Sequence, residues 1–84
     1  MEMPKGKFTI AEAASAWIEM IEKSDAAAQQ KADMVEKIKA GAEQAIGTIY
    51  GVGRVRLADG TKLPCFADAT NAIKRVMRGE AERA

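Results

Sequence analysis

The 84-residue sequence contains no histidine and a single cysteine, Cys65. Without histidine the commonest general base at neutral pH is missing, and Ser-His and Cys-His nucleophilic sites are excluded. One thiol cannot form an internal disulfide, and it supplies too few ligands for the four-coordinate site of a structural zinc. The remaining acid-base candidates, Glu19 and Glu22, share a helix face with Lys23, which is typical of a solvated surface. We therefore expect a protein that is not an enzyme and that needs no metal or cofactor.

Aromatic residues are also scarce, at 5% of the sequence, although 48% of the residues are hydrophobic. Much of that hydrophobic fraction is alanine, which buries little surface per residue. A chain of this size supports one core, so we expect a single small domain over residues 1–84. Because an internal disulfide and a metal are excluded, association with further copies is the remaining source of stability, and we predict a homo-oligomer, a dimer or higher.

Long apolar runs are absent as well. Residues 1–7 contain a proline, a glycine and two lysines, and we expect them to form a flexible lead-in rather than a signal peptide. No stretch is long and apolar enough to span a membrane. Together with the lone cysteine, which fits a reducing compartment, these features predict a soluble, cytoplasmic protein with no membrane partner.

The sequence that follows begins with a strong helix signal. Thr9 and Glu12 have the spacing of a capping box, in which each side chain accepts a hydrogen bond from the other residue's backbone amide. An apolar stripe at helical spacing continues from there, and Trp17, its largest member, is expected to anchor the core. Glu19 and Lys23 form a favourable i,i+4 pair on the outside of this helix.

Residues 9–46 are either one long helix or two helices. One helix of this length would need a partner chain to cover its apolar stripe. A turn near Ser24–Asp25 lets the two halves cover each other within one chain, and we favour this alternative. Ser24 or Asp25 is then the expected N-cap of the second helix, because their side chains can accept from the first free amides.

An alanine-rich seam runs along this helical segment. Ala28, Ala42 and Ala45 belong to it, and small residues allow helices to approach closely. The seam is either part of the core of one chain or an interface between copies, and because such residues bury little area we favour the interface.

The helical pattern ends at Gly47, and the sequence then changes to period two. Gly51–Gly53 lacks the spacing of a phosphate-binding loop, so it is interpreted as a hinge. Residues 54–66 predict a β-hairpin, and a three-residue loop over 58–60 separates its faces better than a two-residue turn. In that register the predicted pairs are Leu57 with Thr61, Arg56 with Lys62, and Val55 with Leu63. Val55, Leu57, Leu63 and Cys65 then face inward.

The last element is a helix whose expected N-cap is Asp68 or Thr70 and whose expected stop is Gly79. Residues 80–84 are predicted to fray. The fold class is therefore mainly α (α+β): a helical hairpin or long helix, then a two-stranded β-hairpin and a C-terminal helix.

Charge is distributed unevenly along the chain. Residues 1–49 carry six Lys and Arg against eight Asp and Glu, whereas residues 50–84 carry seven against four. Six of the C-terminal cations are expected to point outward from the hairpin and the last helix, and they form the candidate binding patch: Arg54, Arg56, Lys62, Lys74, Arg75 and Arg78. The alternative is that the hairpin cations protect an exposed edge strand against aggregation.

These features predict a non-catalytic interaction protein, a homo-oligomeric helical scaffold that presents a basic hairpin-helix surface to an acidic protein partner. Such a short chain without cofactors fits an inhibitor or adaptor, a class that includes phage-encoded proteins. One alternative is a DNA- or RNA-binding module that uses the same cations. Another is a sponge for an anionic small ligand such as a nucleotide.

Overall fold

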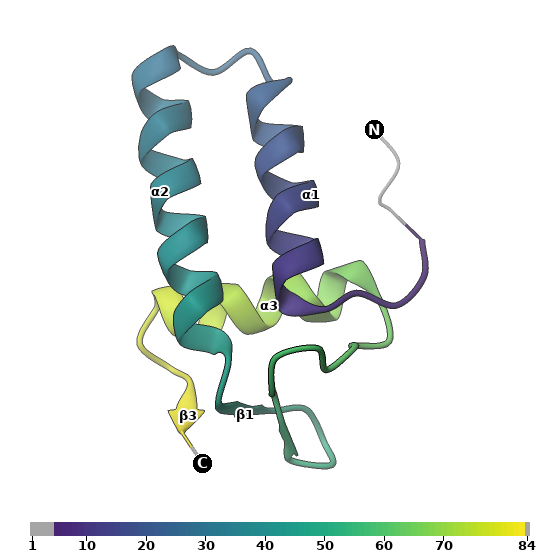
Figure 1. The fold of residues 1–84 in the computed structure, drawn as a ribbon. Coiled ribbons are helices and arrows are strands. Elements are labelled where there is room, and N and C mark those ends of the chain that lie inside the picture. Colours follow the sequence, from purple (N-terminus) through teal and green to yellow (C-terminus); the bar gives the residue numbers. More distant parts are fainter. Residues whose placement is uncertain (1–4, 84) are drawn as a thin grey trace.

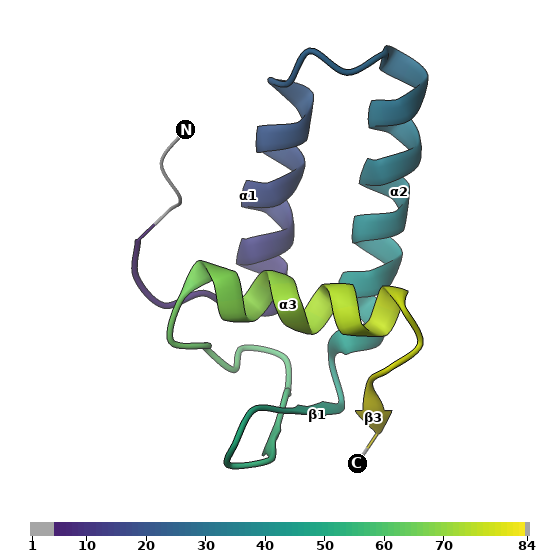
Figure 2. The ribbon, with the colours of Figure 1, turned by 180° about the vertical axis from the view of Figure 1, so that it is seen from behind.

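The computed structural model describes residues 5–83 of the chain. Its elements are α1 (Ile10–Glu22), α2 (Ala28–Ala45), β1 (Thr48–Tyr50), β2 (Val55–Arg56), α3 (Phe66–Met77) and β3 (Glu82–Arg83). We call the side-by-side pair of α1 and α2 the arm; α3 crosses one end of the arm, and the small sheet lies beyond α3 (Figure 1, Figure 2). The mainly helical fold class and the order of helices, hairpin and C-terminal helix are as the sequence predicts.

The predicted capping box at the start of α1 is confirmed. The Thr9 amide donates to Glu12 Oε1 at 3.0 Å, and the Glu12 amide donates to Thr9 Oγ1 at 3.1 Å. The hydrogen bond from the Thr9 amide is the largest cause that lowers the pKa of Glu12 below its ordinary value of 4.5. The expected ion pair between Lys23 and Glu19 is also present, at 3.3 Å.

Of the two alternatives for residues 9–46, the structure contains the pair of helices with a turn between them. The predicted N-cap of the second helix is wrong, because Ala27 occupies this position and provides no side-chain hydrogen bond. Ser24 instead follows Lys23, the C-cap of α1, and its hydroxyl donates to the Ile21 carbonyl at 2.7 Å. Lys31 then links the two helices by donating to the Glu22 carbonyl at 2.9 Å.

The hairpin is present, but the predicted register is wrong. β1 pairs with β2 through Ile49 and Arg56 and through Tyr50 and Val55, and the turn between them covers residues 51–54. A third strand adds to the other side of β1, which gives the order β2-β1-β3. Leu63, the predicted partner of Val55, forms an isolated bridge with Phe8 near the start of α1.

The register differs because an earlier segment makes the turn. Gly51 and Arg54 have positive φ angles of 85° and 51°, which close the chain seven residues before the predicted loop. Residues 58–61 make a separate turn, in which the Thr61 amide donates to the Ala58 carbonyl at 3.0 Å. Leu57 and Leu63 are buried as predicted, whereas Val55 and Cys65 are exposed, which contradicts their predicted inward orientation.

α3 begins two residues before Asp68, the first predicted cap. Cys65 is its N-cap, without a side-chain hydrogen bond, and neither Asp68 nor Thr70 has that role. Phe66 is buried and packs edge to face on Phe8 with ring centroids 5.4 Å apart, so tertiary packing fixes the first turn. Gly79 ends the helix as predicted, with φ 74° and its amide donating to the Val76 carbonyl.

One cluster of buried side chains connects the three helices, and Ile38, Leu57 and Ile73 are its largest fully buried members. Trp17 packs against this cluster but is only partly buried, so the prediction of a core anchor is confirmed in part. Ala42 and Ala45 lie inside the cluster, which contradicts their predicted place in an interface between copies. Ala28 is exposed at the start of α2.

The predicted lead-in and frayed tail each fall partly outside the described residues, which exclude 1–4 and 84. Residues 5–7 are exposed. Glu82 and Arg83, which were expected to fray, instead pair with Ile49 and Thr48 of β1. Within residues 5–83, no helix is both long enough and apolar enough to cross a membrane.

Candidate binding site

α3 divides the six predicted cations between two sides of the molecule. Lys74 lies over the Trp17 ring of α1, 5.5 Å from its centroid, on the flank of α3 that faces the arm. Arg75 lies over the Tyr50 ring of β1 at 5.4 Å, and its guanidinium donates to the Ile49 carbonyl at 3.4 Å, on the flank that faces the sheet. The predicted patch is therefore not one continuous face.

Three of the six cations have carboxylate partners within the chain. Arg54 pairs with Glu82 of β3 at 3.0 Å, Lys62 pairs with Glu12 at 3.7 Å, and Arg78 pairs with Glu80. All these side chains are more than half exposed, so the pairs contribute little to stability. They do lower the positive potential that the cations present to a partner.

The hairpin cations also separate between the two faces of the sheet. Ile49 and Arg56 are directly opposite each other, and so are Tyr50 and Val55. Because neighbouring side chains of a strand point to opposite faces, Arg56 lies on the face opposite to Tyr50 and Val55. Among the described residues Arg56 pairs with no carboxylate, so it keeps its full charge at the sheet edge.

A hollow of about 540 Å³ lies on the Tyr50 and Val55 face. Most of its lining is apolar or glycine, and Lys62 and Asp68 are its charged groups. Its lining residues are Tyr50, Gly51, Val52, Gly53, Val55, Lys62, Leu63, Pro64 and Asp68. Arg54 lies in the turn and reaches the face of Arg56, because it pairs with Glu82, which is opposite Ile49. We call this hollow, together with Arg54 and Arg56, the hairpin surface.

The polar end of the hollow is organised around Asp68. The Tyr50 hydroxyl donates to Asp68 Oδ1 at 3.4 Å, and the Cys65 thiol donates to Asp68 Oδ2 at 3.4 Å. Burial raises the pKa of Tyr50, and the negative charge of Asp68 raises it further. Tyr50 therefore stays protonated at neutral pH and acts as a hydrogen-bond donor. Asp68 thus holds both polar groups at this end of the hollow.

The tip of the hairpin carries an apolar side chain that sequence reasoning did not identify. Val52 is fully exposed, and Val55 is 49% exposed. Val52 lies between Gly51 and Gly53, which have no side chains against which it could pack. The signal was available in the sequence, because a valine between two glycines in a turn has nothing to cover it. In Figure 1 this turn lies at the end of the molecule opposite to the far end of the arm.

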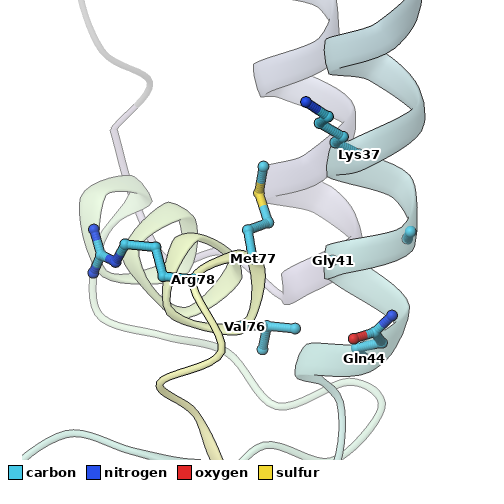
Figure 3. A pocket seen from close by; sticks show the side chains of 7 residues that line it. Lys37, Gly41, Gln44, Val76, Met77 and Arg78 are labelled. Carbon is cyan, nitrogen blue, oxygen red and sulfur yellow. The ribbon is translucent and has the colours of Figure 1, made fainter.

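Arg78 lines a different groove, between α2 and the end of α3, where Lys37 and Met77 are also found (Figure 3). Sequence analysis did not single out Lys37, because α2 has cations on several sides. As for metals, residues 5–83 contain no group of three or more histidine, cysteine, aspartate or glutamate side chains that could hold an ion.

Comparison with known proteins found no family model, no curated protein and no solved structure that matches this chain.

Proposed function

We propose that this chain is a non-catalytic interaction protein that binds an acidic protein partner through the hairpin surface. The observation that carries the proposal is the apolar hollow beside Lys62, with Val52 exposed at the tip of the hairpin. Protein interfaces are commonly built from a few apolar contacts in a pocket surrounded by polar groups. The hairpin surface offers both.

An acidic partner fits this surface in two ways. An apolar side chain of the partner fills the hollow, while a neighbouring carboxylate binds Lys62 in place of Glu12, whose pairing at 3.7 Å is long. Because the hairpin is narrow, a partner that encloses its tip also reaches Arg54 and Arg56 on the opposite face. The apolar contacts supply affinity, and the cations favour an acidic partner.

The charges favour a protein partner over nucleic acid. Binding to a nucleic acid backbone depends on many cations that are free to neutralise phosphates. Here three of the six predicted cations are paired with carboxylates, and two lie over aromatic rings. A partner with one or two carboxylates and an apolar side chain uses the hollow as well, whereas a phosphate backbone does not. We propose an inhibitor or adaptor in the cytoplasm as the biological role.

The test uses the wild-type chain and two hairpin variants as baits in extract of the producing cell. The variants are Val52→Asp and the double variant Arg54→Glu with Arg56→Glu. A partner of the hairpin surface is retained by the wild type and lost by both variants, and after purification its affinity for each variant is lower by about tenfold or more. Wild-type affinity also weakens as salt rises.

The matched control is Lys23→Glu with Lys39→Glu, which makes the same change in charge at exposed positions of the arm. This control should bind as the wild type does. All variants should keep their helical circular dichroism, because none of the substituted side chains is buried. Equal binding by the wild type and both folded hairpin variants would contradict the proposal.

A further inference from the structure

A groove of about 550 Å³ lies between α2 and the C-terminal end of α3, and it shares no lining residue with the hollow at the hairpin. Figure 3 shows the Met77 side chain extending from α3 along α2, with Lys37 above it and Gly41 beside it. Gln44 and Arg78 complete its polar rim. A groove of this volume is within the usual range of binding sites.

Gly41 makes the groove possible. A Cβ at this position would lie 3.0 Å from Met77 Cγ and 3.1 Å from Ile73 Cγ2, so α2 and α3 touch where α2 has no side chain. The floor of the groove is therefore backbone and the flexible Met77 side chain. Met77 remains 43% exposed, although it lies between two helices.

Beyond the lining of the groove, the same face of α2 continues toward the far end of the arm and carries Met34. Met34 is 42% exposed, and it precedes Lys37 by three residues and Gly41 by seven, so all three share one face of α2. From Met34 to Gln44 this face is roughly 15 Å long at 1.5 Å per residue, about three helical turns. Methionine side chains adapt their shape to different apolar partners.

Both charged residues that line the groove, Lys37 and Arg78, are cations, although Arg78 pairs with Glu80. Lys37 is exposed and pairs with no carboxylate of the described residues. Lys74 precedes Met77 by one helical turn and lies over Trp17 on the flank of α3 that faces the arm. Asp33 is the acidic residue next to Met34, at the opposite end from Arg78.

We infer that this groove binds an amphipathic helix of a partner protein that carries apolar side chains on one face and carboxylates beside them. Apolar side chains at i, i+3 or i+4, and i+7 contact Met34 and Met77, and the carboxylates lie opposite Lys37 and Lys74. The inference rests on the proposed function only in that both treat the chain as a binding protein. With two separate surfaces, the chain acts as an adaptor that joins two partners.

The probes are three synthetic peptides of about 15 residues each, a length at which helix formation becomes favourable. The first has leucine at helical spacing with flanking glutamates. The second has lysine in place of every glutamate. The third has the composition of the first, but its leucines are scrambled around the helix. Binding to the isotopically labelled full chain is followed by the NMR shifts of backbone amides and of the Trp17 indole.

The first peptide should shift the amides of Gly41 and Met77 and leave Val52 unchanged. Its affinity should exceed that of both other peptides by about fivefold or more, because they lose either the charge or the apolar face. Lys37→Glu should weaken the first peptide by about tenfold, and Lys39→Glu, the same change on the opposite side of α2, by less than about twofold. Unchanged circular dichroism confirms that both variants fold.

Any of four results overturns the inference. Equal binding by the glutamate and lysine peptides removes the charge argument. Shifts confined to the hairpin surface would show that the peptide binds there and not in the groove. The absence of a shift of Gly41 at about 1 mM peptide would show that the groove does not bind it. A doubling of the chain's mass that Lys37→Glu abolishes assigns the groove to a second copy. The variant Arg54→Glu with Arg56→Glu should keep full peptide affinity, so the inference and the proposed function fail or hold separately.

Discussion

At the scale of single residues, Gly41 lies where an added Cβ would be tightly packed. The nearest atoms to an added Cβ belong to Met77, which is partly exposed and flexible, and to Ile73, which is fully buried. Met77 can move aside, but Ile73 is held by the core on every side. The sequence shows only a glycine in the middle of a helical segment, where glycine is normally unfavourable.

We expect Gly41→Ala to lower the free energy of unfolding by about 1 kcal/mol. Overpacking typically costs about 1 to 3 kcal/mol, and the better helix propensity of alanine offsets about 1 kcal/mol of this. The Tm should fall by about 4 to 8 °C in thermal unfolding. In a background of Met77→Ala, which removes one of the two contacts, the same substitution should cost less. A higher Tm for Gly41→Ala alone would contradict this prediction and show that Ile73 shifts to make room for the added methyl group.

Burial of individual residues could be predicted only in part. Leu57 and Leu63 are buried as the sequence indicates, although their backbone partners are not the predicted ones. Val55 is exposed because the turn over residues 51–54 places it at the end of the hairpin, and Cys65 is exposed because it is the N-cap of α3 and not part of a strand. The leucines are buried because they are strongly hydrophobic, whereas the burial of Val55 and Cys65 depends on where the turn and the helix place them.

At the scale of elements, the capping box of α1 combines a local signal with a titratable group. The pKa of Glu12 is lowered chiefly by the hydrogen bond from the Thr9 amide, and Lys62 lowers it further. A carboxyl whose pKa is lower in the folded chain stabilises the fold above its unfolded pKa. This contribution disappears as the pH falls through the folded value.

We predict that Glu12→Gln is less stable than the wild type at pH 7 and that the difference shrinks as the pH falls below about 4.5. Thermal unfolding of both proteins from pH 7 to about 3 measures the difference, and the other carboxyls cancel in it. Glu36→Gln, on the exposed outer side of α2, should follow the wild type at every pH. A constant difference between Glu12→Gln and the wild type would mean that Glu12 acts only through its shape.

Element boundaries were predictable where the signal is local and not where packing decides. Thr9 with Glu12 and Gly79 act within one turn of the chain, and both are confirmed. The start of α3 depends on the contact of Phe66 with Phe8, fifty-eight positions apart, which no local pattern reveals. The hairpin turn depends on Arg54 adopting a positive φ angle, which is uncommon for arginine.

At the scale of the whole molecule, the position of α3 decides what becomes of the predicted cation patch. The sequence correctly indicates which side chains are kept out of the core, because charged residues stay in water. It does not reveal that α3 lies between the arm and the sheet, so that Lys74 and Arg75, adjacent in the chain, contact opposite parts of the molecule. The hollow at the hairpin and the groove beside Met77 also arise from this arrangement.

Self-association remains a prediction, although Ala42 and Ala45 do not form its interface. Ala42 and Ala45 belong to the core of one chain, so the support that remains is the small core of an 84-residue chain. We expect a dimer or higher oligomer at micromolar concentration, measured by light scattering. A mass near 9.0 kDa would contradict this prediction.

The arm extends beyond α3, so its far half is held by two helices alone (Figure 2). Every residue from 22 to 30 is exposed, and the buried residues of α2 all lie from Ile38 onward. Local opening of this half exposes little apolar surface, so its free energy is lower than that of the half beside α3. Met34 belongs to the loosely held half and Gly41 to the tightly held one. We therefore expect the end of the groove beside Gly41 to be the more rigid one and the surface around Met34 to open more readily.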